Sequence, residues 1–174
     1  MSAESEVAVD DSLEPVPRTC WVGVGSPHGD DRVGWIVIDR LRSRAIPGTE
    51  YVKLLSPVDL LDLADRPFRR WLICDAFAGR GPVGHLRHWR WPANELDNVC
   101  FSGSHDISLV AALTLAGNLR RLPSRVDIWG IDVGPQPPGG TVARAPEGTL
   151  GVGNVLQSRL GPIVQRLATV YRDA

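Results

Sequence analysis

The sequence predicts a single-domain, three-layer α/β sandwich, in which a mostly parallel, twisted sheet of about five strands carries helices on both faces. Strand-like apolar segments alternate with segments of helical periodicity through most of the chain. Three of the strand-like segments, at residues 19–24, 71–74 and 126–133, are apolar on both faces. Such segments are typical of parallel strands that are buried between two layers of helices.

The first half of the chain contains three of the expected strands. In chain order we expect a strand at 19–24, a glycine-rich turn at 23–34, a helix at 33–41, a strand at 51–55, a helix at 56–64 and a strand at 71–74. The first helix is indicated by apolar residues that follow Val33 at helical spacing, and Pro47 with Gly48 ends this unit. Ser56 and Pro57 are residue types that are favoured at the N-cap and the first position of a helix.

The second half of the chain continues the alternation. In chain order we expect a turn at 79–84, a strand at 85–91, a loop at 102–105, a helix at 106–122, a strand at 126–133, a loop at 134–151 and a helix at 154–171. The strand at 85–91 is more polar on one side, which indicates an edge strand. Pro123 ends the helix at 106–122. Pro162 is expected either to kink the last helix or to mark the start of another.

Composition and charge exclude several classes of protein. Hydrophobic residues make up 43% and charged residues 22% of the 174-residue chain, as in soluble globular proteins. The formal net charge of -1 argues against a dedicated nucleic-acid binder. No apolar run approaches the roughly 18 residues that a membrane-spanning helix requires. We therefore expect neither nucleic acid nor a membrane among the partners, and we expect one domain at residues 18–174.

The first 17 residues are expected to form a disordered acidic tail, because they hold five acidic side chains and no lysine, arginine or aromatic residue. A secretory signal would begin with basic residues and continue with an apolar run, so none is expected. The three cysteines, Cys20, Cys74 and Cys100, are widely spaced and form no CxxC pair. This usage indicates a cytoplasmic protein, in which Cys20 and Cys74 act as small hydrophobic residues within strands.

The glycine-rich turn holds the first candidate functional residues. It follows a strand and opens a helix, as a dinucleotide-binding fingerprint does, but His28 stands where GxGxxG requires glycine. The adjacent carboxylates Asp30 and Asp31 would also repel a pyrophosphate, so we exclude nucleotide binding. One of these carboxylates can act as the N-cap of the following helix, which leaves the other free for another role.

Further candidates lie where loops follow or precede predicted elements. Asp75 stands at the carboxyl end of a strand, where open α/β sheets bind ligands, although an aspartate here can also cap a turn. His105 lies in a loop of small residues before a helix, and the alternative is a solvent-exposed histidine. His28, two residues before the acidic pair, is a third candidate, whereas His85 and His88 point to opposite faces of a strand and cannot bind one ion. Carboxylates and imidazoles that converge from separate loops suit zinc, nickel or manganese.

These motifs, in this order, resemble those of the [NiFe]-hydrogenase maturation endopeptidases, the HybD-like peptidase family M52. The family's first loop, GxGNPxxGDDGxG, is similar to GVGSPHGDDRVG here, which is one residue shorter. The family's VDA-like strand end and glycine-rich turn correspond to ICDA and GRGPVG, and its Ser-x-His loop corresponds to SGSHDISLVAAL. A later VxxxGI strand is matched by VDIWGI, so the resemblance extends from Cys20 to Val133.

The resemblance implies a five-stranded α/β sandwich that removes a short C-terminal extension from the large-subunit precursor of a [NiFe] hydrogenase after nickel has been inserted. It implies that Asp31, Asp75 and His105 contact the nickel, with Asp31 and Asp75 as catalytic carboxylates. The nickel belongs to the substrate and serves as the recognition signal, so no permanent cofactor is expected. The family pattern does not supply His28, for which two interpretations stay open: an auxiliary metal or substrate contact, or a solvent-exposed turn residue.

Two alternative functions stay open at this point. A self-contained metallohydrolase would use Asp31, Asp75, His105 and His28 around a permanently bound ion. A non-catalytic, nickel-sensing chaperone would bind a hydrogenase subunit and release it uncut. Metal analysis of the purified protein tests the first alternative, and incubation with a nickel-loaded precursor tests the second.

Overall fold

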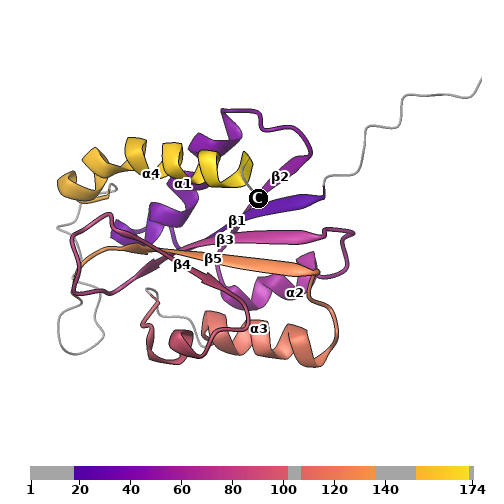
Figure 1. Ribbon diagram of the computed structural model, residues 1–174. Coiled ribbons are helices and arrows are strands. Elements are labelled where there is room, and N and C mark those ends of the chain that lie inside the picture. Colours follow the sequence, from indigo (N-terminus) through magenta and orange to yellow (C-terminus); the bar gives the residue numbers. More distant parts are fainter. Residues whose placement is uncertain (1–17, 102–106, 136–151, 173–174) are drawn as a thin grey trace, which may run out of the picture.

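The computed structural model describes residues 18–101, 107–135 and 152–172, and it confirms the predicted fold class. Its five-stranded sheet has the order β2-β1-β3-β5-β4 (Figure 1). The strands are β1 (Thr19–Val24), β2 (Thr49–Leu54), β3 (Arg70–Phe77), β4 (Leu86–Arg90) and β5 (Arg125–Asp132). Neighbouring strands are parallel, except that β4 runs antiparallel to β5. β4 lies at an edge of the sheet, as its one-sided polarity predicts.

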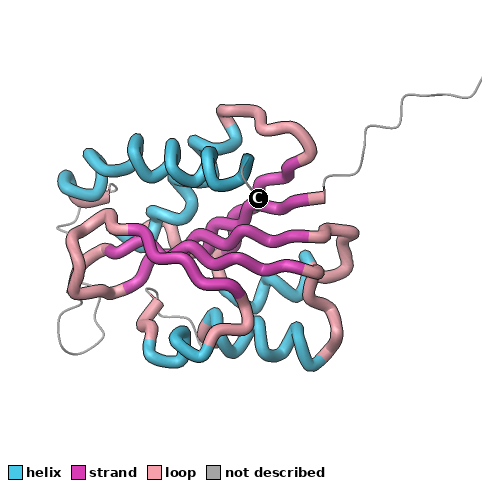
Figure 2. Tube along the Cα trace, in the orientation of Figure 1, coloured by secondary structure: helices cyan, strands magenta, loops and turns pink. Residues whose placement is uncertain are grey.

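Helices cover both faces of the sheet (Figures 1 and 2). α1 (Val33–Arg42) and α4 (Asn154–Arg172) lie on one face, and α2 (Leu60–Leu63) and α3 (Leu109–Asn118) lie on the other. Short 3₁₀ turns occupy Gly29–Arg32, Pro57–Asp59 and Asn94–Asn98. Within the described part of the chain, no helix is long and apolar enough to cross a membrane.

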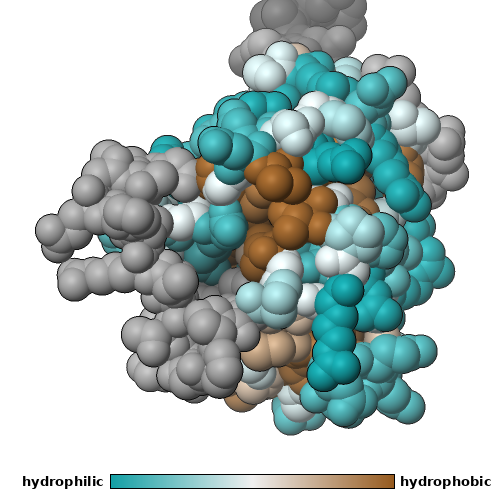
Figure 3. Space-filling model, turned by 90° about the vertical axis from the view of Figure 1, so that its left-hand side faces the viewer, coloured by the Kyte–Doolittle hydropathy of each residue, from teal (hydrophilic) through white to brown (hydrophobic). Residues whose placement is uncertain are grey.

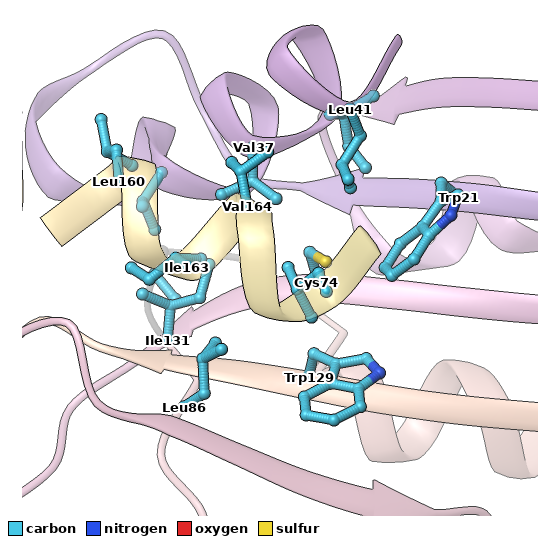
Figure 4. Packing of buried hydrophobic residues seen from close by; sticks show 14 of the residues in the cluster. Trp21, Val37, Leu41, Cys74, Leu86, Trp129, Ile131, Leu160, Ile163 and Val164 are labelled. Carbon is cyan, nitrogen blue, oxygen red and sulfur yellow. The ribbon is translucent and has the colours of Figure 1, made fainter. Parts of the chain in front are cut away.

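The two faces of the sheet form two hydrophobic layers, because successive side chains of a strand point in opposite directions. The layer beneath α1 and α4 contains Trp21, Leu72, Cys74, Trp129 and Ile131 (Figure 4). The opposite layer contains Cys20, Val22, Trp71, Ile73 and Ile128. Cys20 and Cys74 are fully buried, as predicted, and burial raises the pKa of the Cys20 thiol to about 12 and also raises the pKa of Cys74. Both thiols therefore stay protonated at neutral pH and serve as packing groups.

Element boundaries differ from the sequence predictions at two places near the site. β3 continues to Phe77 instead of ending at residue 74, because it pairs with β5 as far as Asp132. α3 begins at Leu109 rather than at residue 106, because Ser108 is its N-cap and its hydroxyl accepts a hydrogen bond from Ala111 N–H at 3.1 Å. The predictions for residues 1–17, for the loop at 102–105 and for most of the loop at 134–151 fall outside the described residues.

α4 continues without a break through Pro162, so the predicted restart of the helix at this proline is wrong. Apolar residues on both sides of the proline pack into the same buried layer, namely Leu156, Leu160, Ile163, Val164 and Leu167. Burial of this continuous apolar face outweighs the backbone hydrogen bond that a proline removes from a helix.

Candidate active site

The candidate site lies at the edge of the sheet where β1, β3 and β5 end, on the left of Figure 1. The glycine-rich turn crosses this edge after β1, and its 3₁₀ turn contains Asp31. Asp75 lies on β3, one residue beyond the last pair that this strand forms with β1. Asp31 is 6% exposed and Asp75 is 0% exposed. The structure therefore buries two of the predicted site residues at this edge of the sheet.

Two glycines let the turn fold onto the strand ends. A Cβ on Gly34 would clash with the carbonyl oxygen of Val24 and stand 2.8 Å from that of Cys74, so α1 begins in direct contact with β1 and β3. A Cβ on Gly25 would likewise clash with the carbonyl oxygen of Asp31. The clashing atoms belong to the backbone, which cannot move aside as a flexible side chain can. These close approaches hold Asp31 against the end of β3.

Asp75 is a buried carboxylate without a partner. Within the described residues, neither of its oxygens has a hydrogen-bond partner, and Oδ1 of Asp31 also has none. The backbone N–H of Ala76 lies close enough to act on the Asp75 carboxylate and to oppose a rise of its pKa, so turn capping by Asp75 stays an open alternative. Burial and then the negative charge of Asp31 raise the pKa of Asp75 well above its usual range. An unsatisfied buried polar group costs about 1–3 kcal/mol, and a cation bound here would supply the missing partner.

Neither Asp30 nor Asp31 caps a helix, so the capping alternative for this pair is wrong. His28 is the N-cap of the 3₁₀ turn and Arg32 is the N-cap of α1, and neither position has a side-chain capping hydrogen bond. Asp30 Oδ1 instead accepts a hydrogen bond from Gly153 N–H at 2.7 Å. Asp30 therefore ties the turn to the start of α4, while Asp31 faces the site.

A pocket of about 420 Å³ lies beside Asp75 and includes this residue in its wall. The rest of the wall is mainly apolar and includes Pro57, Leu96, Val99, Phe101, Leu109 and Val110. Figure 3 views the molecule from this side and shows hydrophobic residues gathered near the centre of the face, with polar residues around them. An apolar pocket that meets a buried carboxylate is suited to hold an apolar side chain next to a reacting group.

The histidines contribute less to the described site. His105, the predicted third metal contact, lies outside the described residues. His28, the predicted auxiliary contact, is exposed. Considering only residues that the structure describes, we find no group of three His, Cys, Asp or Glu side chains that could hold a metal ion. Participation of His105 and His28 in metal binding therefore stays a prediction.

Asp132 is another buried carboxylate at this edge, and it is not among the residues that the sequence motifs predicted. Asp132 ends β5 and is 2% exposed. Its Oδ1 accepts a hydrogen bond from Gly134 N–H at 2.8 Å, and its Oδ2 accepts one from Gly81 N–H at 3.1 Å. Asp132 therefore fixes the turn that follows β3. The criterion that selected Asp75, an aspartate at the carboxyl end of an apolar strand, applies equally to Asp132 and could have found it.

We expect Gly34→Ala to lower the free energy of unfolding by about 1–3 kcal/mol, because the added methyl group forces α1 away from the strand ends. Thermal unfolding followed by circular dichroism measures this effect. Gly117→Ala in α3 is the matched control, since its new Cβ would stand 3.4 Å from Leu122 Cδ1 and alanine favours the helix. If both variants unfold at the wild-type temperature, the close approach at Gly34 does not constrain the turn.

Solved structures of hydrogenase maturation proteases share this fold, whereas no family model and no curated protein matches the chain. The hydrogenase maturating endopeptidase HybD from E. coli has a TM-score of 0.62 at 17% sequence identity, over 90% of this chain and 93% of that one. The [NiFe] hydrogenase maturation protease HybD from Thermococcus kodakarensis has a TM-score of 0.61 at 15% identity, over 88% of this chain and 98% of that one. The hydrogenase 2 maturation peptidase from a Thaumarchaeota archaeon has a TM-score of 0.58 at 20% identity, over 88% of this chain and 97% of that one.

The chain therefore has the fold of the HybD-type hydrogenase maturation proteases, and the resemblance in its motifs is confirmed at the level of the fold. The match covers nearly the full length of each of these proteins. At these identities the likeness establishes the fold alone, and the chemistry of the site has to be argued from this chain's own residues.

Proposed function

We propose that this protein is an endopeptidase that removes the C-terminal extension of a [NiFe]-hydrogenase large-subunit precursor after nickel insertion, in the cytoplasm. One observation carries the proposal: Asp75 is buried without a partner beside Asp31 and lines an apolar pocket, in a fold shared with hydrogenase maturation proteases. A pair of buried carboxylates next to a pocket is suited both to bind a cation and to activate water.

In this proposal the nickel ion enters the site with the substrate. Asp31 and Asp75 offer carboxylate oxygens and His105 offers a neutral imidazole nitrogen to an ion that the substrate already holds. A divalent cation favours the ionised form of Asp75, which burial and the charge of Asp31 disfavour by raising its pKa. A precursor without nickel offers no such partner, which would make cleavage depend on completed metal insertion.

Hydrolysis then requires an activated water molecule and a polarised peptide carbonyl. Asp31 acts as the general base, accepting a proton from the water as the water oxygen attacks the carbonyl carbon. The cation stabilises the negative charge that develops on the carbonyl oxygen. The proton passes to the amide nitrogen when the C–N bond breaks, and the C-terminal extension leaves with a free amino group.

The proposal is tested by incubating the wild-type protein with nickel-loaded and with nickel-free precursor and measuring the precursor mass. We expect only the nickel-loaded precursor to lose its C-terminal extension. Stoichiometric, tightly bound metal in protein purified without added metal would favour the self-contained metallohydrolase instead. Binding of a nickel-loaded precursor that keeps its full length would favour the nickel-sensing chaperone.

We expect the affinity of the protein for nickel to weaken as pH falls through about 6.5, because only a neutral imidazole can bind the ion. His105→Ala should remove this step from a calorimetric titration of nickel at several pH values. An unchanged step in the variant would assign it to another group.

His28→Ala is the matched control for His105→Ala. As an auxiliary contact on an exposed turn, His28 should contribute about tenfold to nickel affinity, while the step near pH 6.5 persists in its absence. Wild-type affinity in this variant would exclude His28 from the site and leave Asp31, Asp75 and His105 as the proposed ligands.

A further inference from the structure

A row of arginines lies at the amino-terminal edge of the sheet, opposite the candidate active site (Figure 1, right). Arg18 precedes β1, Arg69 and Arg70 stand at the start of β3, Arg125 begins β5, and the antiparallel β4 ends with Arg90. The backbone joins them directly, since Arg69 N–H and Arg70 N–H donate to the carbonyl oxygen of Arg18, and Arg125 N–H donates to that of Arg69. These five residues are called the arginine row below.

A single buried carboxylate is the counter-ion for three members of the row. Asp127 is 0% exposed, and its Oδ2 accepts hydrogen bonds from Arg70 Nε at 2.9 Å and from Arg125 Nε at 2.7 Å. Arg90 Nε lies 3.7 Å from Oδ1 of the same carboxylate. Considering only the part of the chain that the structure describes, Arg18 and Arg69 form no ion pair. Three guanidinium groups thus share one carboxylate, and the other two arginines of the row have no carboxylate partner among the described residues.

The side chains of the arginine row are wholly or partly exposed to solvent, so another anion can reach them. The side chains of Arg90, Arg125 and Arg70 are 62%, 29% and 12% exposed, and Arg18 and Arg69 are exposed as well. Neighbouring strands are only about 4.8 Å apart, so these like charges repel one another. Additional carboxylates at this edge would relieve that repulsion.

We propose that the acidic segment at residues 1–17 of this same chain binds the arginine row. The segment carries five carboxylates and no lysine or arginine; they belong to Glu4, Glu6, Asp10, Asp11 and Glu14. The segment ends directly at Arg18, the first member of the row. The chain itself therefore holds the carboxylates near the arginines, at an effective concentration of about millimolar.

The segment is long enough to cover the whole row. From β1 to β4 the row crosses three strand spacings, which is about 14 Å at about 4.8 Å each. Glu14 precedes Arg18 by four residues, which gives an extended reach of about 13 Å at about 3.3 Å per residue. Asp11 and Asp10 reach about 23 Å and about 26 Å on the same scale, so carboxylates can meet every arginine from Arg18 to Arg90. Asp75 lies at the other edge of the sheet, so binding leaves the proposed active site open.

The binding is tested by nuclear magnetic resonance on the full-length chain, with Arg69→Gln/Arg90→Gln as the variant and Arg80→Gln/Arg166→Gln as the control. Both double variants remove two exposed arginines, and the control pair lies outside the arginine row. The sequence of residues 1–17 is the same in all three proteins, so shift differences in their amide signals report binding. At about 0.01 M salt we expect the amide signals of residues 4–14 to move in the row variant and to stay in place in the control.

Measurements at high salt and at low protein concentration test whether the contact is electrostatic and whether it lies within one chain. At about 1 M salt the screening length is only about 3 Å, so the amide signals of wild type and row variant should coincide. Dilution should leave the low-salt difference unchanged, since the contact lies within one chain. A difference that disappears on dilution would assign the contact to two copies and overturn the proposal.

A second variant tests the contact from the other side, because the acidic segment is changed and the signals of the arginines are observed. Substitution of all five acidic residues of the segment, as Glu→Gln and Asp→Asn, should shift the Nε–H signals of Arg70, Arg90 and Arg125. Two results together would overturn the proposal. The amide signals of residues 4–14 would have the same chemical shifts in wild type and row variant, and the arginine Nε–H signals would not change when the segment is neutralised. If the arginine signals do not change when the segment is neutralised but shift when heparin is added, the arginine row binds an external polyanion. This result would also overturn the proposal.

Discussion

Asp75→Asn should abolish cleavage of the nickel-loaded precursor while the protein stays folded. Asparagine has nearly the shape of aspartate, but it cannot carry the negative charge that binds a cation. Asp75 pairs with Gly130 of β5 inside the sheet, so the backbone fixes the direction of its side chain. We expect the cleavage rate to fall by about 10²-fold or more, because the loss of even a supporting contact of a metal site costs about 10–100-fold in metal affinity or activity.

The same substitution should raise the stability of the metal-free protein at neutral pH. Burial and the charge of Asp31 raise the pKa of Asp75 above the value of about 3.8 that applies to the unfolded chain. Between these two pKa values the folded state binds more protons than the unfolded state, so the free energy of unfolding falls as pH rises. The contribution is fully present below the unfolded pKa and is lost as pH rises through the folded pKa. Asparagine does not titrate, so the variant lacks this decline.

Precursor cleavage and thermal unfolding, measured on the same samples at several pH values, test both expectations for Asp75. Asp39→Asn is the matched control, because the Asp39 side chain is 49% exposed and forms an ion pair with Lys53 at the surface. Cleavage at the wild-type rate would remove Asp75 from the active site. Lower stability than wild type at neutral pH would identify Asp75 as a structural carboxylate. Gain of stability with loss of function is the pattern expected of an active-site group.

The sequence was sufficient to predict the strands and the edge that carries the site. β1 has the predicted bounds because its six residues are mostly apolar and all buried, and a glycine-rich turn follows directly. The carboxyl ends of parallel strands meet at one edge, so this rule predicted that Asp75 and the acidic pair of the glycine-rich turn would lie together, while the choice of Asp31 came from the resemblance. The parallel direction of β1, β3 and β5 was predicted by the two-sided apolar pattern of these strands.

The division of roles between Asp30 and Asp31 could not be read from local sequence. The partner of Asp30 is the backbone of Gly153, which lies 123 residues further along the chain. The position of the turn depends in the same way on contacts of Gly34 with two different strands. α4 continues through Pro162 because tertiary packing of the helix outweighs the tendency of proline to break a helix. Each of these features is set by long-range contacts rather than by periodicity.

Asp127→Asn should lower the free energy of unfolding by about 3 kcal/mol, because it leaves several guanidinium groups around a position without charge. Removing one member of a buried ion pair costs about 3–5 kcal/mol, and the lower figure applies here since Arg125 and Arg90 are partly exposed. At about 2–4 °C per kcal/mol, the unfolding temperature should drop by about 6–12 °C. Asp39→Asn removes an exposed carboxylate that pairs with Lys53, and it should cost less than about 1 kcal/mol.

The effect of Asp127→Asn should depend on pH in the direction opposite to that of Asp75→Asn. Burial alone would raise the pKa of Asp127, but hydrogen bonds from Arg125 and His88 and the charge of Arg70 outweigh it and hold this pKa below its usual range. The stabilisation is therefore present above the unfolded pKa of about 3.8 and is lost as pH falls through the lower, folded pKa. Unfolding temperatures of variant and wild type should converge in acid and separate toward neutral pH. A difference that stayed constant with pH would mean that Asp127 stabilises the edge of the sheet by its shape and hydrogen bonds rather than by its charge.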